Sequence, residues 1–551
     1  MRKLYKILFV TLTFILLSGF LTNYFEISKN LEIFNNIYRE LETSYVETIN
    51  PGELMKKTID GMLETLDPWT IYIPESDVED YRERAITGDY GGIGSKIRKI
   101  DDFIVIAEPF KDSPADKAGL KIGDKIIEIN GETLQNLSTS DASELLRGSA
   151  GTSVKIKLES PSGEVRDVEV KRDKIHTSTV PHYELLTNNI GYVKLTQFKR
   201  RSAQEIKNAI LELQDDVAEF LNVSDESNNN LNGLILDLRN NGGGLLSECR
   251  EIVNLFVPKG DTILIAKGKS KSWDKQYITS KKPLYQDMPI VVLINEHSAS
   301  ASEIVAGCLQ DLDRGVVVGR KSFGKGLIQQ NQKIAYNTQL KLTVAKYYTP
   351  SGRCIQKIDS NKENQVTDSL QSIFFTQNGR KVYGGGGIDP DVEMEEKKRL
   401  SILISLIKDN CIFNFGNEIF NNIDFPGSAK DFELQDSTYK IFQEYLEREK
   451  YPFSVYSEEV ISLLEESLKE ELYLDAMKKD VETIRANIMN NKKNDLIRHE
   501  AEIRKIISND LILRNFYQNG VIEYNLKTDS YVSRALEILN DKNQYSSILA
   551  P

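Results

Sequence analysis

The chain has 551 residues, enough for three or four domains, and 40% of them are hydrophobic, as in globular proteins. Its 70 basic and 82 acidic residues give a net charge of −12. No basic stripe stands out, and this argues against a nucleic-acid partner, which clustered Lys and Arg would bind. No group of His, Cys, Asp and Glu has the spacing of a metal site, so we expect neither a metal nor a cofactor.

The N-terminal segment, residues 1–25, has the pattern of an export signal. Arg2, Lys3 and Lys6 precede an apolar run over residues 7–21 that contains no charged residue. The pattern fits either a signal peptide or an N-terminal membrane anchor, and the lack of an Ala-x-Ala cleavage site favours the anchor. We therefore expect the chain on the extracytoplasmic, periplasmic side of the cell envelope, anchored in the inner membrane by residues 7–21.

Residues 26–85 are expected to form a helical segment. Apolar residues recur at helical spacing over residues 26–48, and a second helix is predicted over residues 52–66, directly after Pro51. The simplest role for this pair is to cover the core of a neighbouring domain.

Residues 113–131 read Ser-Pro-Ala-x-x-Ala-Gly-Leu-x-x-Gly-Asp-x-Ile-x-x-Ile-Asn-Gly. This run is the most specific part of a resemblance between residues 86–173 and a PDZ domain. The run Tyr-Gly-Gly-Ile-Gly at residues 90–94 resembles the loop that binds a peptide's carboxylate in such domains. A purely structural β-barrel is the alternative.

In a PDZ domain the tail of a partner protein adds a strand beside this loop. The resemblance implies that the tail pairs along residues 93–97 and lies against a helix predicted at residues 139–147. It also implies that backbone N–H groups hold the tail's carboxylate, and the peptide-binding residues would be Gly91, Gly92, Ile93 and Gly94.

From residue 190 the chain alternates strands and helices. The predicted elements are strands at 190–195, 233–238, 262–267, 289–294 and 315–319, with helices at 203–221 and 245–256. Such alternation indicates right-handed crossovers and a largely parallel sheet. The polar loop at residues 222–232 is predicted to be solvated and disordered.

A serine-rich turn joins the strand at 289–294 to an apolar helix that ends near Gln310. The turn carries Ser298, Ser300 and Ser302, and a later turn flanked by glycines carries Lys325. None of the 4 histidines lies in a turn that would aim it at a serine, so a neutral lysine is the candidate base.

A neutral lysine requires a dry environment. Lowering a lysine pKa from about 10.4 to about 7 takes roughly 4.6 kcal/mol, which is within the range that burial supplies. The apolar neighbours Phe323 and Leu327 are the candidates for shielding Lys325 from water.

A second glycine-rich turn, residues 240–244, follows the strand at 233–238 and opens the next helix. Backbone N–H groups in such a turn can point at a developing oxyanion. The same layout can bind a phosphate.

Four motifs, in order along residues 35–395, resemble those of the carboxyl-terminal processing (tail-specific) proteases. They are Asp-Leu-Arg-x-Asn-Gly-Gly at 237–243, Asn-x-x-Ser-Ala-Ser-Ala-Ser-Glu at 295–303, Phe-Gly-Lys-Gly-x-x-Gln at 323–329, and Gly-Gly-Ile-x-Pro-Asp at 386–391. One departure is Asn241, where the family often has proline, and this leaves open which glycine serves the oxyanion.

The resemblance assigns roles to residues of these motifs. Ser300 would be the nucleophile, Lys325 the general base, and Gln329 the residue that orients the lysine. The oxyanion hole would be formed by backbone N–H groups of Ala301 and of the turn that contains Gly242 and Gly243. Ser302 would cap the helix that follows the nucleophile.

The implied fold is a multidomain α/β and α+β protein. A crotonase-like α/β Ser-Lys protease core would occupy residues 174–397, with the inserted PDZ domain at 86–173 and a helical extension at 398–551. The implied function is that of a serine endopeptidase that binds the C-terminal tails of proteins and cleaves peptide bonds through an acyl-enzyme. Some family members use an N-terminal arm to dimerise, so formation of a homodimer is the alternative role for residues 26–85. The alternative is a catalytically silent PDZ scaffold that binds peptides in the cell envelope.

The C-terminal extension is predicted to be helical at 400–408, 437–449, 457–489 and 495–518. Charges of both signs interleave along it, and this is typical of a solvated helical surface. The four cysteines are widely spaced, so disulfides are possible in an exported protein. Cys249 and Cys308 lie on predicted core helices, where buried free thiols are expected instead.

Overall fold

The computed structural model describes residues 24–135, 137–221, 230–357, 372–395, 400–449, 451 and 456–551. The chain divides into one unit of Met1–Val78 with Gln329–Thr343, and a second of Glu79–Ile328 with Val344–Pro551. The predicted anchor at residues 7–21 and most of the polar loop at 222–232 fall outside the described residues. Within the described ranges, no helix has the length and apolarity needed to span a bilayer.

The first unit contains the two predicted N-terminal helices. Residues 24–44 are helical, and α2 (Pro51–Glu64) begins with the Asn50 side chain accepting from the N–H groups of Gly52 and Glu53. Asn and Pro at these positions are strong helix-start signals, which explains why the start of α2 could be predicted. Strand β1 (Ile71–Ile73) then pairs antiparallel with the first half of β18 (Gln339–Tyr348).

The second unit is built around a sheet that runs in the spatial order β10-β11-β12-β15-β16-β21. Neighbours from β11 to β21 are parallel, and β10 is antiparallel at one edge. The strands are β10 (His182–Leu186), β11 (Ile190–Lys194), β12 (Gly233–Asp237), β15 (Ile290–Ile294), β16 (Val316–Gly319) and β21 (Val392–Glu393). The predicted parallel sheet is therefore confirmed for the strands at 190–195, 233–238, 289–294 and 315–319, whereas the predicted strand at 262–267 is antiparallel to its neighbours in a separate sheet.

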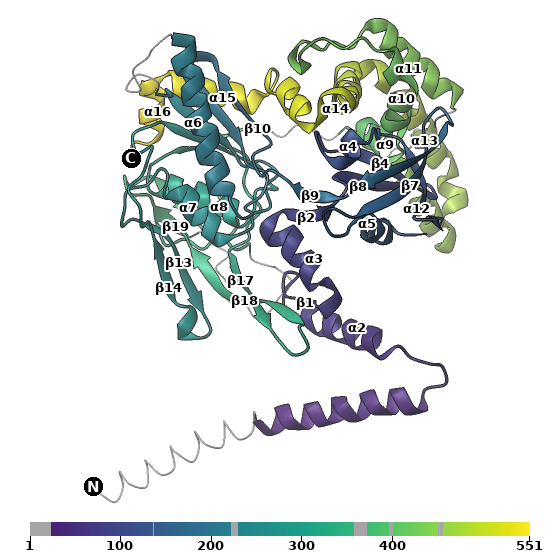
Figure 1. Ribbon diagram of the computed structural model, residues 1–551, viewed down its shortest axis with the longest axis horizontal. Coiled ribbons are helices and arrows are strands. Elements are labelled where there is room, and N and C mark those ends of the chain that lie inside the picture. The colour runs from purple at the N-terminus through teal and green to yellow at the C-terminus, as the bar shows by residue number, and fades with distance from the viewer. Residues whose placement is uncertain are drawn as a thin grey trace, which may run out of the picture. The chain divides into compact units, whose positions relative to one another are not determined.

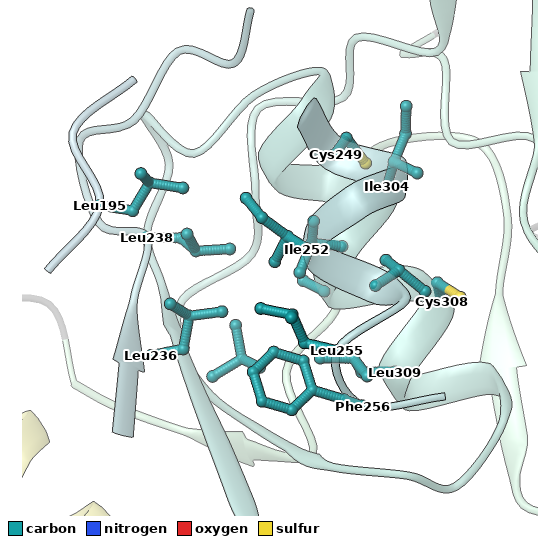
Figure 2. Close-up of a cluster of buried hydrophobic side chains, with 14 of the residues drawn as sticks. Leu195, Leu236, Leu238, Cys249, Ile252, Leu255, Phe256, Ile304, Cys308 and Leu309 are labelled. Atoms are coloured by element: carbon teal, nitrogen blue, oxygen red, sulfur yellow. The ribbon is translucent and has the colours of Figure 1, made fainter. Parts of the chain in front are cut away.

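Helices α6 (Ser202–Leu221), α7 (Leu246–Val253) and α8 (Ala301–Asp311) pack on one face of this sheet (Figure 1). Every residue of α8 is buried, including the polar Ser302, Glu303, Gln310 and Asp311 among its apolar residues. The side chains of Cys249 on α7 and Cys308 on α8 lie in the same apolar cluster as Leu236 (Figure 2). Both cysteines are buried free thiols, as predicted.

The opposite face of the sheet is covered by the end of the chain. Helix α15 (Ser530–Asn540) buries Val532, Ile538 and Leu539 against sheet residues that include Tyr192 and Leu293. No helix was predicted here: α15 has its charged residues on its outer side, while its apolar positions meet the core. The sheet thus has a helical layer on each side, as mainly parallel sheets require.

The rest of the extension has its own apolar core, centred on Phe415, Phe442 and Leu511. The helices of the whole extension are α9 (Ser401–Lys408), α10 (Cys411–Ile419), α11 (Asp436–Arg448), α12 (Tyr456–Glu470), α13 (Leu474–Arg498), α14 (Glu500–Leu526), α15 and α16 (Lys542–Ile548), of which α15 and α16 pack on the core sheet. The predicted helix at 457–489 is two helices, because Leu472 has a positive φ of 64° between α12 and α13.

The PDZ region contains a sheet in the order β3-β4-β5-β7-β8, with β3 at its edge. Its strands are β3 (Ser95–Ile100), β4 (Phe103–Pro109), β5 (Lys125–Ile129), β7 (Ser153–Glu159) and β8 (Val165–Lys171), and its helices are α4 (Pro114–Lys117) and α5 (Thr139–Leu146). β2 (Asp89–Gly92) and β9 (Asp173–His176) pair where the chain enters and leaves this region. Val105 and Ile122 of this region pack against Phe413 of α10, so the helical extension also contacts the PDZ region.

Smaller elements complete the second unit. β13 (Thr262–Gly268) pairs with β14 (Lys275–Ile278) and with the end of β18. From Gln329 on, β17 (Leu327–Lys333) belongs to the first unit, and it also pairs with β18. β19 (Ile373–Phe375) and β20 (Lys381–Tyr383) form a short hairpin. Residues 358–371, which precede this hairpin, lie outside the described residues.

Candidate active site

Ser300 lies at the junction between the buried strand β15 and helix α8. It occupies the N-cap position of α8 with φ 55° and ψ −111°. This backbone conformation is rare for a residue with a side chain, and it persists only where surrounding contacts impose it. Such strain is typical of a nucleophile held on a sharp strand-to-helix turn.

The prediction that Ser302 caps the helix is wrong. Ser300 itself holds the N-cap position. The Ser302 hydroxyl is fully buried and donates to the carbonyl oxygen of Asn241 at 2.8 Å. Ser302 therefore ties the turn that carries the predicted nucleophile Ser300 (residues 295–300, the nucleophile turn) to the glycine-rich turn.

The lysine turn is tied to the nucleophile turn by Glu303, which is fully buried in the first turn of α8. Glu303 Oε2 accepts from the Ser300 N–H at 2.7 Å and from the Lys325 N–H at 2.9 Å. Glu303 Oε1 accepts from the Gly324 N–H at 2.7 Å and from the Ser322 hydroxyl at 2.6 Å. One carboxylate thus fixes the main chain of both candidate dyad residues.

Burial raises the pKa of Glu303 above its ordinary value. The hydrogen bonds from Ser322, Lys325, Gly324 and Ser300 act in the opposite direction but do not cancel the effect of burial. No cation is needed to satisfy this carboxylate, because N–H and O–H donors occupy both of its oxygens.

Tyr347 on β18 makes a second link between the two turns. Its buried hydroxyl lies 2.9 Å from the Lys325 carbonyl oxygen and 3.1 Å from the Ser300 carbonyl oxygen. The single phenol proton is shared between these two acceptors. Ser300 and Lys325 are therefore joined through their N–H groups by Glu303 and through their carbonyl groups by Tyr347.

The glycine-rich turn after β12 is fixed by paired amides. The Asn240 N–H donates to Asn295 Oδ1 at 2.9 Å, and Asn295 Nδ2 donates to Asn240 Oδ1 at 2.8 Å. Asn295 belongs to the loop that leads to Ser300. The amide pair therefore holds the glycine-rich turn beside the nucleophile turn.

Asn241, the residue that departs from the family motif, is fully buried. Its Nδ2 donates to the Leu195 carbonyl at 2.9 Å, and its Oδ1 accepts from the Gly243 N–H at 2.9 Å. The Gly243 N–H is thus already bonded within the turn. Of the predicted oxyanion donors, Gly242 and Ala301 are the better placed, since Gly242 is exposed and Ala301 is in the first helical turn.

Gly243 is needed where it stands. Its φ is 97°, and a Cβ there would lie 2.7 Å from the Ala299 carbonyl oxygen and 2.8 Å from the Ser300 Cβ. A Cβ at Gly242, by contrast, would have no neighbour within 4 Å. Close backbone approach between the two turns therefore depends on Gly243 and not on Gly242.

The Lys325 side chain is half-buried. Phe323, predicted to shield it, is 47% exposed, and Leu327 is half-buried. Gln329, on β17, donates from Nε2 to the Trp69 carbonyl at 2.6 Å. Its predicted role in orienting the lysine stays a prediction.

The strand before the glycine-rich turn ends in a buried charge cluster. Asp237 Oδ2 accepts from Tyr192, Lys194 and Arg239 at 2.7, 3.0 and 2.7 Å. Burial alone would raise the pKa of Asp237, but Lys194 and Arg239 outweigh it and hold this pKa well below its ordinary value. Asp237 is therefore ionised and anchors the end of β12.

The predicted peptide-binding residues lie together at the start of the PDZ sheet. Gly91 and Gly92 belong to β2, Ile93 is buried in the PDZ core, and Gly94 has a φ of 76°. A Cβ on Gly91 would lie 2.2 Å from the carbonyl oxygen of Gly148, just after α5. The glycines thus allow the loop to approach the end of α5, beside the edge strand β3.

Glu303 and Tyr347 are the site residues whose roles sequence reasoning missed. Glu303 stands inside a quoted motif, and an acidic residue at the start of an otherwise apolar helix was a usable signal. Tyr347 carried no signal, because an aromatic residue in a β-strand is ordinary core material.

Three segments of the chain match known families. Residues 189–366 match Peptidase family S41, residues 105–160 match the PDZ domain family, and residues 402–539 match a family described as "Probable PDZ-protease, C-terminal helical domain". The third match covers most of the helical extension.

Curated relatives match over most of their length. The carboxy-terminal processing protease CtpA of Bacillus subtilis (strain 168) is 31% identical over 73% of this chain and 81% of its own. A "Probable CtpA-like serine protease" of Staphylococcus aureus (strain MRSA252) is 32% identical over 71% of this chain and 69% of its own. The solved structure of a photosystem II D1 C-terminal processing protease is 26% identical, over 65% of this chain and 86% of that chain, with a TM-score of 0.35.

The identity to curated relatives over more than two thirds of both chains confirms the resemblance that the four motifs carried. The PDZ match includes the run at residues 113–131, and the S41 match includes the first three of the four motifs. The chain therefore belongs to peptidase family S41, as a serine-type peptidase of the carboxy-terminal processing group that carries a PDZ domain.

Proposed function

We propose that this peptidase cleaves proteins after capturing their C-terminal tails, with Ser300 as nucleophile and Lys325 as general base. The observation that carries the proposal is the sharing of Glu303 Oε2 by the N–H groups of Ser300 and Lys325. Two turns held this closely are suited to a hydroxyl and an amine that act on one peptide bond.

In the proposed reaction, neutral Lys325 takes the proton of the Ser300 hydroxyl as its Oγ attacks the substrate carbonyl. The N–H groups of Ala301 and Gly242 stabilise the oxyanion, with Gly243 keeping the two turns close. Lys325 then gives the proton to the leaving amine, and an acyl-enzyme forms on Ser300. Water, activated by the same lysine, releases the product. Gln329 is proposed to orient Lys325.

Bound substrate would help to make the lysine neutral. Lys325 is half-buried, and an extended substrate lying over it would exclude more water. Desolvation disfavours the charged amine and so lowers its pKa towards neutrality.

The PDZ region supports tail capture through its geometry. Strand β3 is at the edge of its sheet, and α5 flanks it, so an extended peptide has a strand edge to pair with. The tail's carboxylate would be held by N–H groups at Gly91, Gly92, Ile93 and Gly94. Because β3 is an edge strand, this mode of binding needs no rearrangement of the sheet.

The remaining proposals concern location and assembly. We place the protein in the cell envelope, anchored by residues 7–21, from the basic-then-apolar pattern of that segment. We also propose that the helix at residues 24–44 associates two copies of the chain. Phe25 and Leu31 on this helix are 65% and 63% exposed, more than is usual for an apolar helix face in a monomer. The core at 174–397 is proposed to be crotonase-like.

A peptide pair tests the proposal. One unstructured peptide ends in an apolar residue with a free carboxylate, and the other has the same sequence with a C-terminal amide. We expect the wild-type protein to cleave the free-acid peptide and Ser300→Ala not to cleave it. We expect Ser300→Ala to bind the amide at least about tenfold more weakly than the free acid, because the charge-assisted hydrogen bonds to the carboxylate are lost. Binding without cleavage by the wild-type protein would favour the silent scaffold. Equal binding of both peptides would contradict tail capture.

A further inference from the structure

The C-terminal extension reaches the back of the catalytic turn. Apolar residues of α15 pack on the core sheet, and the yellow helices α15 and α16 lie beside that sheet in Figure 1. Near the carboxyl end of β12 this packing opens into a cavity of about 380 Å³. Lys194 and Asn240 line it from the core, and Asn525 and Asp529 line it from the extension. Apolar packing alone therefore does not fix the turn on this side.

An ion pair spans the edge of this cavity. Arg239 Nη1 donates to Asp529 Oδ1 at 3.0 Å, and Arg239 Nη2 lies 2.8 Å from Asp529 Oδ2. The side chains of Arg239 and Asp529 are only 14% and 18% exposed. Two parallel contacts between a guanidinium and a carboxylate fix orientation as well as distance, so Asp529 holds Arg239 in one rotational position.

Asp529 is itself held rigidly. It is the N-cap of α15, and its Oδ1 accepts from the N–H groups of Tyr531 at 2.9 Å and Val532 at 3.3 Å. The ring of Tyr531 lies 5.0 Å from the Arg239 guanidinium, within the range of a cation–π contact. The start of α15 thus forms a fixed cradle for Arg239.

Arg239 connects Asp529 to the glycine-rich turn at residues 240–244. It is the last residue before Asn240, and both its main-chain N–H and its Nε donate to Asp237 Oδ1 at 2.9 Å. Main chain and side chain of Arg239 are therefore tied to the same carboxylate. A rotation of the guanidinium would disturb the peptide that begins the glycine-rich turn.

The charges of the cluster balance only with Asp529 present. Lys194 and Arg239 are paired with Asp237 and Asp529. Without the Asp529 carboxylate, two cations would share the fully buried Asp237, and the excess charge would draw Arg239 towards the cavity.

We propose that Asp529, in the C-terminal extension, is a positioning residue for the catalytic turn at residues 240–244, acting through Arg239. This inference rests on the proposed function, since it assigns the extension a part in the same active site. The C-terminal extension would then be required for full peptidase activity.

Asp529→Asn tests this directly in the full-length protein. Asparagine caps a helix as well as aspartate, so α15 keeps its N-terminal hydrogen bonds while the charge is lost. We expect kcat for the free-acid peptide to fall about 10-fold to 100-fold with KM unchanged, because small displacements of catalytic groups have effects of this size. Hydrogen exchange in residues 240–244 should become faster.

Lys430→Ala is the matched control. Lys430, also in the extension, pairs with Glu184 on β10 and does not touch the turn. We expect its kcat and its exchange at residues 240–244 to match the wild type. If Asp529→Asn keeps the wild-type kcat and exchange rates, or if both variants lose activity alike, the proposal is wrong. If the wild type itself cleaves no peptide, the proposed function fails, and the exchange rates of Asp529→Asn still decide whether Asp529 positions the turn.

Discussion

The carboxylate of Glu303 accepts from the main-chain N–H of Lys325, 22 residues further along the chain, at 2.9 Å. The same oxygen accepts from Ser300. A fully buried acid at this point would be costly unless every lone pair were used, and both oxygens are occupied by donors. The active site is therefore organised by hydrogen bonds to a residue that takes no part in the proposed proton transfers.

Glu303→Gln should lower peptide cleavage by at least about tenfold. An amide accepts on one oxygen only, so either Ser300 and Lys325 or Ser322 and Gly324 lose their acceptor. Each buried donor left without a partner costs about 1–3 kcal/mol. Turnover should be measured per folded molecule, with circular dichroism as the check on folding. Wild-type turnover at the same folded fraction would contradict the role given to Glu303.

Gly243→Ala should abolish acylation of Ser300, whereas Gly242→Ala should keep it. The new methyl at position 243 would press on Ala299 and Ser300, while at position 242 it meets open space. Labelling with a serine-directed acylating probe, followed by mass spectrometry, separates the two variants. Equal labelling of both would mean that the spacing of the two turns does not control the nucleophile.

The thiols should differ in reactivity. Cys249 and Cys308 are fully buried, and burial raises the pKa of each, while Cys354 is half-buried. Burial raises the pKa of Cys411 to about 11. Iodoacetamide at pH 7.5, roughly one unit below the usual thiol pKa, should modify Cys354 first in the native protein and all four after unfolding. Rapid native labelling of Cys249 would contradict the packing of α7 against α8.

Stability should fall in acid because of Asp237. Its folded pKa lies below its ordinary value of 3.8, so the ionised form is favoured in the folded state. The contribution is present above about pH 4 and is lost as the pH falls through the folded pKa. Asp237→Asn should lower the urea midpoint at pH 7, since breaking a buried ion pair costs about 3–5 kcal/mol. The urea midpoint of this variant should also change less than that of the wild type as the pH is lowered. An unchanged midpoint at pH 7 would exclude a stabilising role for this carboxylate.

The sequence predicted the parts of the molecule whose signals are local. Asn50 and Pro51 mark the start of α2, and the buried apolar run at residues 290–294 marks β15. The division of the helical extension was not predictable, because Leu472 breaks the helix with a positive φ that leucine rarely adopts.

Most of the features that could not be predicted from the sequence depend on contacts between residues far apart in the chain. Nothing local shows that α15 would cover the second face of the core sheet, or that Asp529 would meet Arg239 across 290 residues. The same holds for Tyr347, whose hydroxyl finds its acceptors only when β18 is in place. The side chain of Asn241 could be recognised as a departure, but its bond to the Gly243 N–H could not.

The pairing of one serine with one neutral lysine is the central claim, and the pH dependence of kcat/KM with the free-acid peptide tests it most directly. We expect kcat/KM to rise with pH as Lys325 loses its proton, and Lys325→Ala to lower the rate about 10²-fold to 10⁴-fold and to remove that dependence, as loss of a general base does. Wild-type rates and an unchanged pH profile in Lys325→Ala would contradict the account.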